Sequence, residues 1–304
     1  MSLSHLPRLV RALTCEPLAV ERGFLDAFVG MVRRRSLEGM SLTGPEIHAE
    51  LGVAMPTKRP TAGAERNIAV VPIYGVISNR AHSMGTGTDQ IGAAFDNAVL
   101  DPRVDGIVLD VDSPGGTIPG VPELAEKIFA ARGTKPIVTV ANGMAASAAY
   151  WIGAAADSAV ITRSGEGVGS IGVYLLHEDW TKALEDDGVK VTEIAAGKFK
   201  TEGAPWKELD ADAEAYLRGR VEEAYGWFVK DVARFRDATP AQVRDGYGEG
   251  RVLNGKAAIE AGLADRVGSL VDTVARMAEK VASRRRSRVA TDVEFRQRTR
   301  ARGA

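Results

Sequence analysis

The chain has 304 residues, 45% of them hydrophobic and 26% charged, with a formal net charge of −1. This is the composition of a soluble globular protein long enough for one large α/β domain with extensions, and its near-neutral charge predicts no general attraction to nucleic acid or membrane. A single cysteine, Cys15, excludes an intramolecular disulfide and fits a reducing compartment.

The N-terminal region lacks the pattern of a secretory signal or a membrane helix. It contains no sustained apolar region ending in a small-residue cleavage site, and the run "GFLDAFVGMV" is short and interrupted by Asp26. We therefore expect a cytoplasmic protein that is neither secreted nor membrane-anchored. The stretch "AVERGFLDAFVGMVRRR" favours a short helix and "AMPTKRPTAGAERN" a polar linker, so residues 1–65 are predicted to form a partly helical N-terminal extension.

From residue 68 onward, short apolar runs alternate with amphipathic segments. Continuous runs rich in β-branched residues are typical of strands buried on both faces; here they are "IAVVPIYGVI", "GIVLDVD", "KPIVTVA", "SAVIT" and "IGVYLL". Helices are predicted over "TDQIGAAFDNAVLD", "VPELAEKIFAARG" and "HEDWTKALEDDG", and the longest over residues 210–237, where apolar side chains recur at spacings of four and three. This alternation predicts an α/β fold with a largely parallel sheet.

The C-terminal end is strongly basic. From Ser283 to the end, eight arginines stand against Asp292 and Glu294, giving this stretch a net charge of +6. Such a block is typical of a solvated tail, so residues 279–304 are predicted to be a disordered basic tail. Contact with an acidic partner or a nucleic acid is the alternative interpretation of this segment.

Two stretches carry candidate chemistry around a carbonyl carbon. In "DVDSPGGTIPG", residues 110–120, a strand ends in paired glycines that can turn their N–H groups toward a ligand, as acyl transfer requires; an ordinary strand-to-helix turn has the same pattern. In "ANGMAASAAYWIG", residues 141–153, Ser147 would begin an Ala-rich helix, where it can be a nucleophile or a plain helix-capping serine.

A third stretch supplies a candidate base. "AAGKFKTEGAPW" follows the strand-like "VKVTEI" and carries Lys198 and Lys200, which would face opposite ways in an extended chain. A lysine acts as a general base only when burial or nearby positive charge lowers its pKa, so a surface role is the alternative for each.

Other patterns in the chain are weaker. "GVGSIG" formally matches a dinucleotide-binding loop, but a strand-like rather than a helical run follows it. The four histidines show no metal-ligand spacing. His177 could join a classical serine triad, although a structural role is the usual one for a histidine beside acidic residues.

Taken in order, "DSPGG", "MAASAAYWIGAAAD", "GVGSIGVY", "GKFKTEGAPW" and the closing "GEGRVLNGKAAIEAGLADRVGSL" resemble the S49 peptidases, the signal peptide peptidase A family of the ClpP/crotonase superfamily. The resemblance covers about residues 67–275. It implies a ClpP/crotonase-like fold of repeated β-β-α units over residues 66–278, with no cofactor and no metal.

The resemblance also assigns roles to residues. It implies Ser147 as the nucleophile, Lys200 as the general base and Ser170 as the group that holds the lysine in place. The oxyanion hole would be the backbone N–H groups of Gly116 and Ala148. Lys198 falls at a variable position and is expected to be a bystander.

The chain departs from the cellular members of the family in having one catalytic unit and no membrane-spanning segment. It looks most like the S49 peptidases of tailed phages, which implies cleavage of scaffold or capsid proteins in the host cytoplasm or the prohead. The resemblance further implies a homo-oligomeric ring in which Lys200 can serve the Ser147 of a neighbouring subunit. The alternatives are a host peptide-degrading peptidase, a crotonase-type enzyme that holds acyl-CoA, and a catalytically silent capsid scaffold component.

Overall fold

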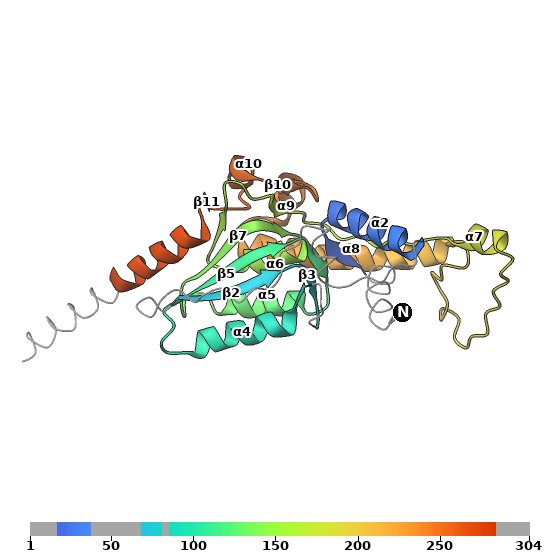
Figure 1. Cartoon of the computed structure of the whole chain (residues 1–304), viewed down its shortest axis with the longest axis horizontal. Coiled ribbons are helices and arrows are strands. Elements are labelled where there is room, and N and C mark those ends of the chain that lie inside the picture. The colour runs from blue at the N-terminus through green and yellow to red at the C-terminus, as the bar shows by residue number, and fades with distance from the viewer. Residues whose placement is uncertain (1–16, 38–67, 81–84, 284–304) are drawn as a thin grey trace, which may run out of the picture.

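The computed structural model describes residues 17–37, 68–80 and 85–283, with the backbone alone for residues 32–37. The predictions for Cys15, the polar linker and the basic tail beyond residue 283 fall outside the described residues. Within them, the chain forms a large sheet and a small sheet flanked by helices (Figure 1). No helix in these ranges has both the length and the apolar character needed to cross a bilayer.

The large sheet is built from strands that the sequence predicts as buried apolar runs. Its strands are β2 (Ile68–Tyr74), β5 (Gly106–Ser113), β7 (Ile137–Ala146), β8 (Ser158–Ile161), β9 (Gly167–Gly169), β10 (Val252–Leu253) and β11 (Arg266–Val267). They follow the order β10-β9-β7-β5-β2, with β8 joining β7 to β11. All of these pairs are parallel except β9 with β10, so the largely parallel sheet is confirmed.

The small sheet stands at the carboxyl end of the large one. Its strands are β1 (Leu18–Val20), β3 (Val76–Ser78), β4 (Gly85–Gly87) and β6 (Gly115–Thr117), in the order β1-β6-β3-β4. Two β-β-α units recur along the chain: β2 and β3 lead to α4 (Thr88–Leu100), and β5 and β6 lead to α5 (Val121–Ala130). The repeated units implied by the ClpP/crotonase resemblance are therefore confirmed. The strand β1 comes from the N-terminal 65 residues and joins this sheet.

The remaining helices complete the layers around the large sheet. They are α2 (Arg22–Leu37), α6 (Ala148–Ala154), α7 (Thr181–Asp186), α8 (Ala211–Phe235), α9 (Pro240–Gly246) and α10 (Gly255–Glu260), and residues 270–283 are also helical. α4, α5, α6 and α8 share one buried cluster with the sheet, while residues 270–283 pack on strand residues of a second cluster. Trp151 of α6 stacks on Phe228 of α8 with ring centroids 4.4 Å apart, which ties the helix after Ser147 to the longest helix.

Two predicted strands are wrong. Val189–Ile194 lies in no strand and is exposed, because no segment of the described chain pairs with it. Residues 171–176 leave the sheet after Gly169, and only Tyr174 forms a bridge, to Leu18. The left-handed backbone of Ser170, with φ 52°, ends the ladder there.

Arg132 links the ends of two helices that lie far apart in the sequence. Its guanidinium donates to the carbonyl oxygens of Ala154, Ala155, Ala156 and Phe235 at 2.5–3.0 Å. We expect Arg132→Ala to lower the free energy of unfolding by about 2–3 kcal/mol, because carbonyl groups of these buried residues lose a charged donor. Urea unfolding measures this loss, and the exposed Arg163→Ala should stay within about 0.5 kcal/mol of the wild type. Equal stabilities of the two variants would contradict the prediction.

Asp265 gives the fold an acid-sensitive contact. Its carboxylate accepts the Ala159 N–H at 2.7 Å and an Arg236 N–H at 2.7 Å. Burial raises the pKa of the Asp265 carboxyl, but the Arg236 and Ala159 hydrogen bonds and the nearby positive charge outweigh it, so the pKa lies below its usual value.

The stabilisation from Asp265 is therefore present above the unfolded-state pKa of about 3.9 and is lost as the pH falls through the lower folded-state pKa. We expect Asp265→Asn to be less stable than the wild type at neutral pH and the difference to shrink below about pH 4. Unfolding curves measured from pH 7 to pH 3 test this. Glu260→Gln, whose ion pair with Lys256 is exposed, is the control and should show no such convergence.

Candidate active site

Ser147 occupies a sharp turn between a strand and a helix. β7 ends at Ala146 and α6 begins at Ala148, so Ser147 alone makes the connection, with φ 55° and ψ −118°. Its N–H donates to the Gly169 carbonyl at 2.7 Å, and its carbonyl accepts the Trp151 N–H at 2.9 Å. A non-glycine residue in such a conformation costs about 1–3 kcal/mol, and strain of this kind clusters at functional sites.

The side chain of Ser147 forms none of the hydrogen bonds that would give it a structural role in the described chain. It is fully buried, and within the described part of the chain its Oγ has no hydrogen-bond partner. It also makes no capping bond to α6, so the interpretation of Ser147 as a helix-capping serine is wrong. Because buried hydroxyls are normally satisfied, an unpartnered one in a strained turn needs a chemical rather than a packing explanation.

Ser170 is brought beside Ser147 by strand register. In the parallel pair of β7 and β9, Ala146 pairs with Gly169, so Ser147 and Ser170 are the next residues on neighbouring strands. Ser170 is buried, has φ 52°, and donates its N–H to the Arg251 carbonyl at 2.8 Å. Two strained serines therefore lie at the carboxyl edge of the large sheet, where active sites of parallel sheets form.

The paired glycines of "DSPGG" pack directly on this turn. Gly115 has φ 95°, and a Cβ placed on it would lie 2.9 Å from the Ala146 carbonyl oxygen and 3.0 Å from the Ala148 amide nitrogen. No other residue type fits there. Gly116 follows in β6, and the Ala148 N–H, as the first of α6, has no acceptor within its helix. The two predicted oxyanion donors thus come from segments that meet beside Ser147.

Ser113 has a positioning role that our sequence analysis missed. Its Oγ donates to the Gly75 carbonyl at 2.6 Å and accepts the Gly115 N–H at 3.1 Å. The buried hydroxyl thereby holds the glycine turn against β2 and β3. Its place directly before Pro114 at a strand end was the available signal, because serine side chains commonly bond to the backbone of adjacent turns.

Lys200 lies apart from this cluster. It is exposed, in a turn closed by the bond from its own N–H to the Gly197 carbonyl at 3.1 Å. This turn belongs to residues 175–210, here called the arm, which contains α7 and extends at the right of Figure 1, away from β7 and α6. Because the Ser147 Oγ has no hydrogen-bond partner among the described residues, Lys200 does not bond to it within one chain. Lys198 instead places its amine 4.6 Å from the centre of the Phe199 ring.

The weaker patterns gain no support from the geometry. His177 makes no hydrogen bond to the Ser147 Oγ. The glycines of "GVGSIG" run through β9 and a turn, and no helix opens at them. In the described ranges, no cluster of three or more His, Cys, Asp or Glu side chains could hold a metal ion.

Comparison with known proteins places the chain in a family. The model of peptidase family S49 matches residues 130–284, which include Ser147, Ser170 and Lys200. The chain belongs to peptidase family S49.

Two phage proteins are similar to this S49 chain over nearly its whole length. The capsid assembly protease C of Escherichia phage lambda is 32% identical over 300 residues, covering 93% of this chain and 68% of that protein. The head-tail preconnector protein GP5 of Enterobacteria phage P21 is 30% identical over 296 residues, covering 92% of this chain but 58% of that protein. A solved structure of a ClpP1 mutant from Listeria monocytogenes is similar over 67% of this chain, with a TM-score of 0.41 and 13% identity.

Proposed function

We propose that this S49 serine peptidase hydrolyses peptide bonds through a dyad of Ser147 and Lys200 contributed by two copies of the chain, and that it cuts scaffold or capsid proteins of a phage head. The observation that carries the proposal is the Ser147 hydroxyl, which is buried and has no hydrogen-bond partner among the described residues. It stands on a strained backbone, beside Ser170 and the amides of Gly116 and Ala148.

The residues divide the reaction between them. Neutral Lys200 takes the proton of Ser147 as its Oγ attacks the substrate carbonyl, and the N–H groups of Gly116 and Ala148 hold the negative oxygen. Lys200 then protonates the leaving amine, and water hydrolyses the acyl-enzyme. A positioned base adds about 10²–10⁴-fold in rate. Ser170 accepts or donates a hydrogen bond that keeps the lysine amine at Ser147.

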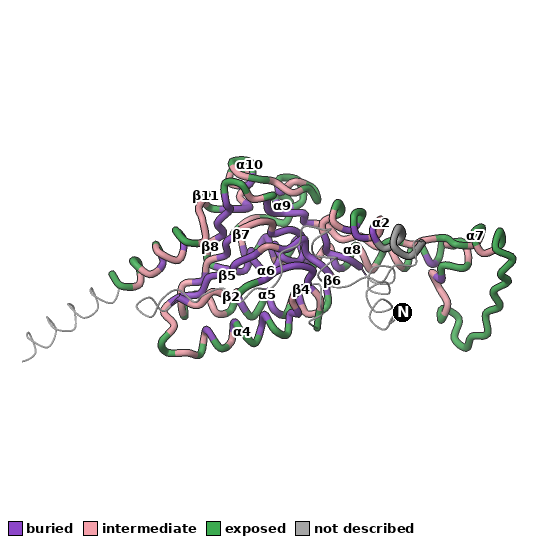
Figure 2. Tube along the Cα trace, in the orientation of Figure 1, coloured by how far each residue is buried: buried purple, intermediate pink, exposed green. Residues whose placement is uncertain are grey.

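The arm supports a dyad shared between copies. A catalytic lysine must be removed from water to be neutral, whereas Lys200 is exposed in the single chain. In Figure 2 most of the arm is coloured as exposed, and residues 185–200 are exposed throughout. Large apolar side chains on it are open to solvent, namely Leu176, Trp180, Val189, Val191, Ile194, Phe199 and Trp206. Exposed apolar surface of this extent is typical of protein interfaces, and a second copy that covers it would also bury Lys200.

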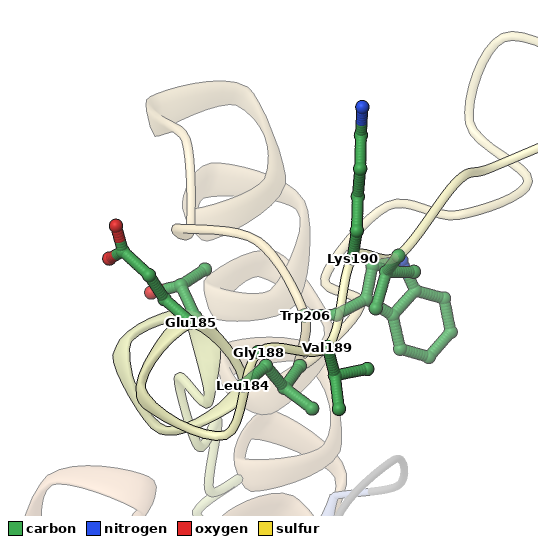
Figure 3. A pocket seen from close by; sticks show the side chains of 8 residues that line it. Leu184, Glu185, Gly188, Val189, Lys190 and Trp206 are labelled. Atoms are coloured by element: carbon green, nitrogen blue, oxygen red, sulfur yellow. The ribbon is translucent and has the colours of Figure 1, made fainter.

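The turn with Lys200 is nevertheless ordered within the arm. The Glu193 carboxylate accepts hydrogen bonds from Thr201 Oγ1 at 2.8 Å and Trp206 Nε1 at 2.6 Å, and these bonds lower the pKa of Glu193. Val189 and Trp206 also line a hollow of about 400 Å³ beside α7, seen in Figure 3. An arm with fixed internal contacts can present Lys200 to a neighbour in one orientation.

The relatives support a phage head protein as substrate. One is named a capsid assembly protease and the other a head-tail preconnector protein, and each matches more than nine-tenths of this chain. This chain spans 68% and 58% of their lengths, so it corresponds to part of each.

A serine-directed phosphonate probe and co-expression test the proposal together. We expect the probe to label Ser147 in the assembled wild-type protein, and co-expressed capsid and scaffold proteins to acquire new ends that mass spectrometry identifies. Labelling that persists in the Ser147→Ala variant would refute the assignment of Ser147 as the nucleophile. Labelling of Ser147 with every head protein intact would refute the substrate class and leave the nucleophile standing.

A further inference from the structure

The short strand β1 lies at the site described above. It pairs antiparallel with the glycine strand β6, with Leu18 opposite Thr117, Ala19 opposite Gly116 and Val20 opposite Gly115. Its other edge is bonded to Tyr174: the Leu18 N–H donates to the Tyr174 carbonyl at 2.8 Å, and the Tyr174 N–H to the Leu18 carbonyl at 3.1 Å. β1 is therefore held between the two segments that follow Ser113 and Ser170.

This is the geometry in which a protein binds an extended peptide. Strand addition satisfies the backbone of the bound segment on both edges, while pockets select alternate side chains. The side chain of Ala19 is fully buried in the same apolar cluster as Ala148 and Ala149, the two residues that follow Ser147.

The carbonyl of Ala19 lies at the predicted oxyanion donors. A Cβ placed on Gly115 would lie 2.3 Å from the Ala19 carbonyl oxygen and 3.0 Å from the Ala148 amide nitrogen, so both atoms converge on one point. Glu21 donates its N–H to the Pro114 carbonyl at 2.7 Å. Because hydrogen-bonded pairs alternate along antiparallel strands, Ala19 and Gly116 form the next bonded pair, and the Gly116 N–H points at the Ala19 carbonyl.

We propose that β1 occupies the peptide-binding groove of this peptidase as a substrate-like strand, with Ala19 in the place of the residue whose carbonyl is attacked. The chain thereby carries its own competing ligand, and a substrate strand with a small residue opposite Gly116 must displace it. This inference rests on the proposed function, because a substrate-like strand requires a peptide substrate. It also explains why Ser147 is fully buried in the single chain.

Tethering makes such a strand an effective competitor. A segment of the same chain binds intramolecularly, at an effective concentration that does not fall on dilution, so a substrate competes only when it binds well or when β1 is loosened. If β1 occupies the groove in about nine-tenths of the molecules, the apparent affinity for substrate falls about tenfold.

A reversible disulfide tests whether β1 must move. Leu18 and Thr117 form a pair without mutual hydrogen bonds, in which Cα atoms lie at a distance that a disulfide can bridge. In a Cys15→Ser background, we expect Leu18→Cys/Thr117→Cys to lose at least about tenfold in kcat/KM when oxidised and to regain it on reduction. Leu18→Cys alone, treated with the same oxidant, is the control. Full activity with the disulfide formed would overturn the proposal.

Loosening β1 should have the opposite effect. We expect Ala19→Glu to lower KM about tenfold for a short peptide, with kcat unchanged. A charged side chain is unfavourable at this buried position, so β1 leaves the groove and the groove becomes free for the peptide. Ala27→Glu makes the same change at an exposed position of α2 and should leave KM unchanged. An unaltered KM in a folded Ala19→Glu protein would count against a displaceable strand.

Hydrogen exchange separates this proposal from the proposed function, because it needs no catalysis. In full-length Ser147→Ala protein, millimolar peptide with the sequence PLAVE of residues 17–21 should replace β1 and speed exchange at Leu18–Val20. The peptide PLEVE, which lacks the small residue, should not. Unchanged exchange with both peptides would show β1 to be a permanent strand, whatever the activity of Ser147.

Discussion

Ser147→Ala should abolish peptide hydrolysis, lowering kcat/KM by at least about 10⁴-fold, while the protein stays folded. The loss is large because no other hydroxyl can replace the Ser147 Oγ in its strained turn between β7 and α6. The fold should tolerate the change, since the Oγ makes no hydrogen bond in the described chain and alanine keeps the Cβ. Hydrolysis of a fluorogenic peptide, with circular dichroism as the check on folding, measures both effects.

The exposed Ser164→Ala is the matched control for Ser147→Ala. It removes the same hydroxyl from a nearby loop and should leave hydrolysis unchanged. A Ser147→Ala protein that retains activity within tenfold of the wild type would remove Ser147 from the mechanism. Loss of activity together with loss of folding would contradict the prediction that the hydroxyl has no structural role.

Mixing two inactive variants should restore activity. Ser147→Ala lacks the nucleophile, and Lys200→Ala should lose about 10²–10⁴-fold with its base. If each site combines Ser147 of one copy with Lys200 of another, an equal mixture assembled at random should have about a quarter of the wild-type sites. Co-expression of the two variants with different tags, purification of the mixed oligomer and assay of its kcat/KM provide the measurement.

Complementation separates a shared dyad from one within a single chain. A dyad formed within one chain predicts an inactive mixture, because no chain then holds both groups. Lys198→Ala should keep wild-type activity on its own, since its amine lies over the Phe199 ring rather than at the predicted base position. Full activity of Lys200→Ala alone would exclude this lysine as the base.

The sequence was most informative where the local pattern decides structure. The apolar runs from Ile68 to Ile161 became buried strands, and the periodic segment at residues 210–237 became α8, because burial on a fixed period is a local property. The order of the motifs also led to the correct family, S49. The roles of Ser147, Lys200, Ser170, Gly116 and Ala148 are still predictions.

The sequence was least informative where a segment depends on distant partners. Val189–Ile194 has the composition of a strand, but a strand needs a neighbour to pair with, and no described segment of the chain pairs with Val189–Ile194. β1, with only three residues, has little signal of its own and exists because β6 and Tyr174 bond to both of its edges.

The candidate site divides between sequence and tertiary structure in the same way. Residue types and spacing identified a serine, paired glycines and a lysine, because these motifs are contiguous in the chain. Ser147 and Ser170 lie side by side because of the register between β7 and β9. The left-handed backbone of Ser147 depends on its hydrogen bonds to Gly169 and Trp151. The sequence therefore determined which groups are present. Only the tertiary structure decided which of these groups meet, that Ser147 is buried and that Lys200 is exposed on the arm, because these depend on contacts between distant segments.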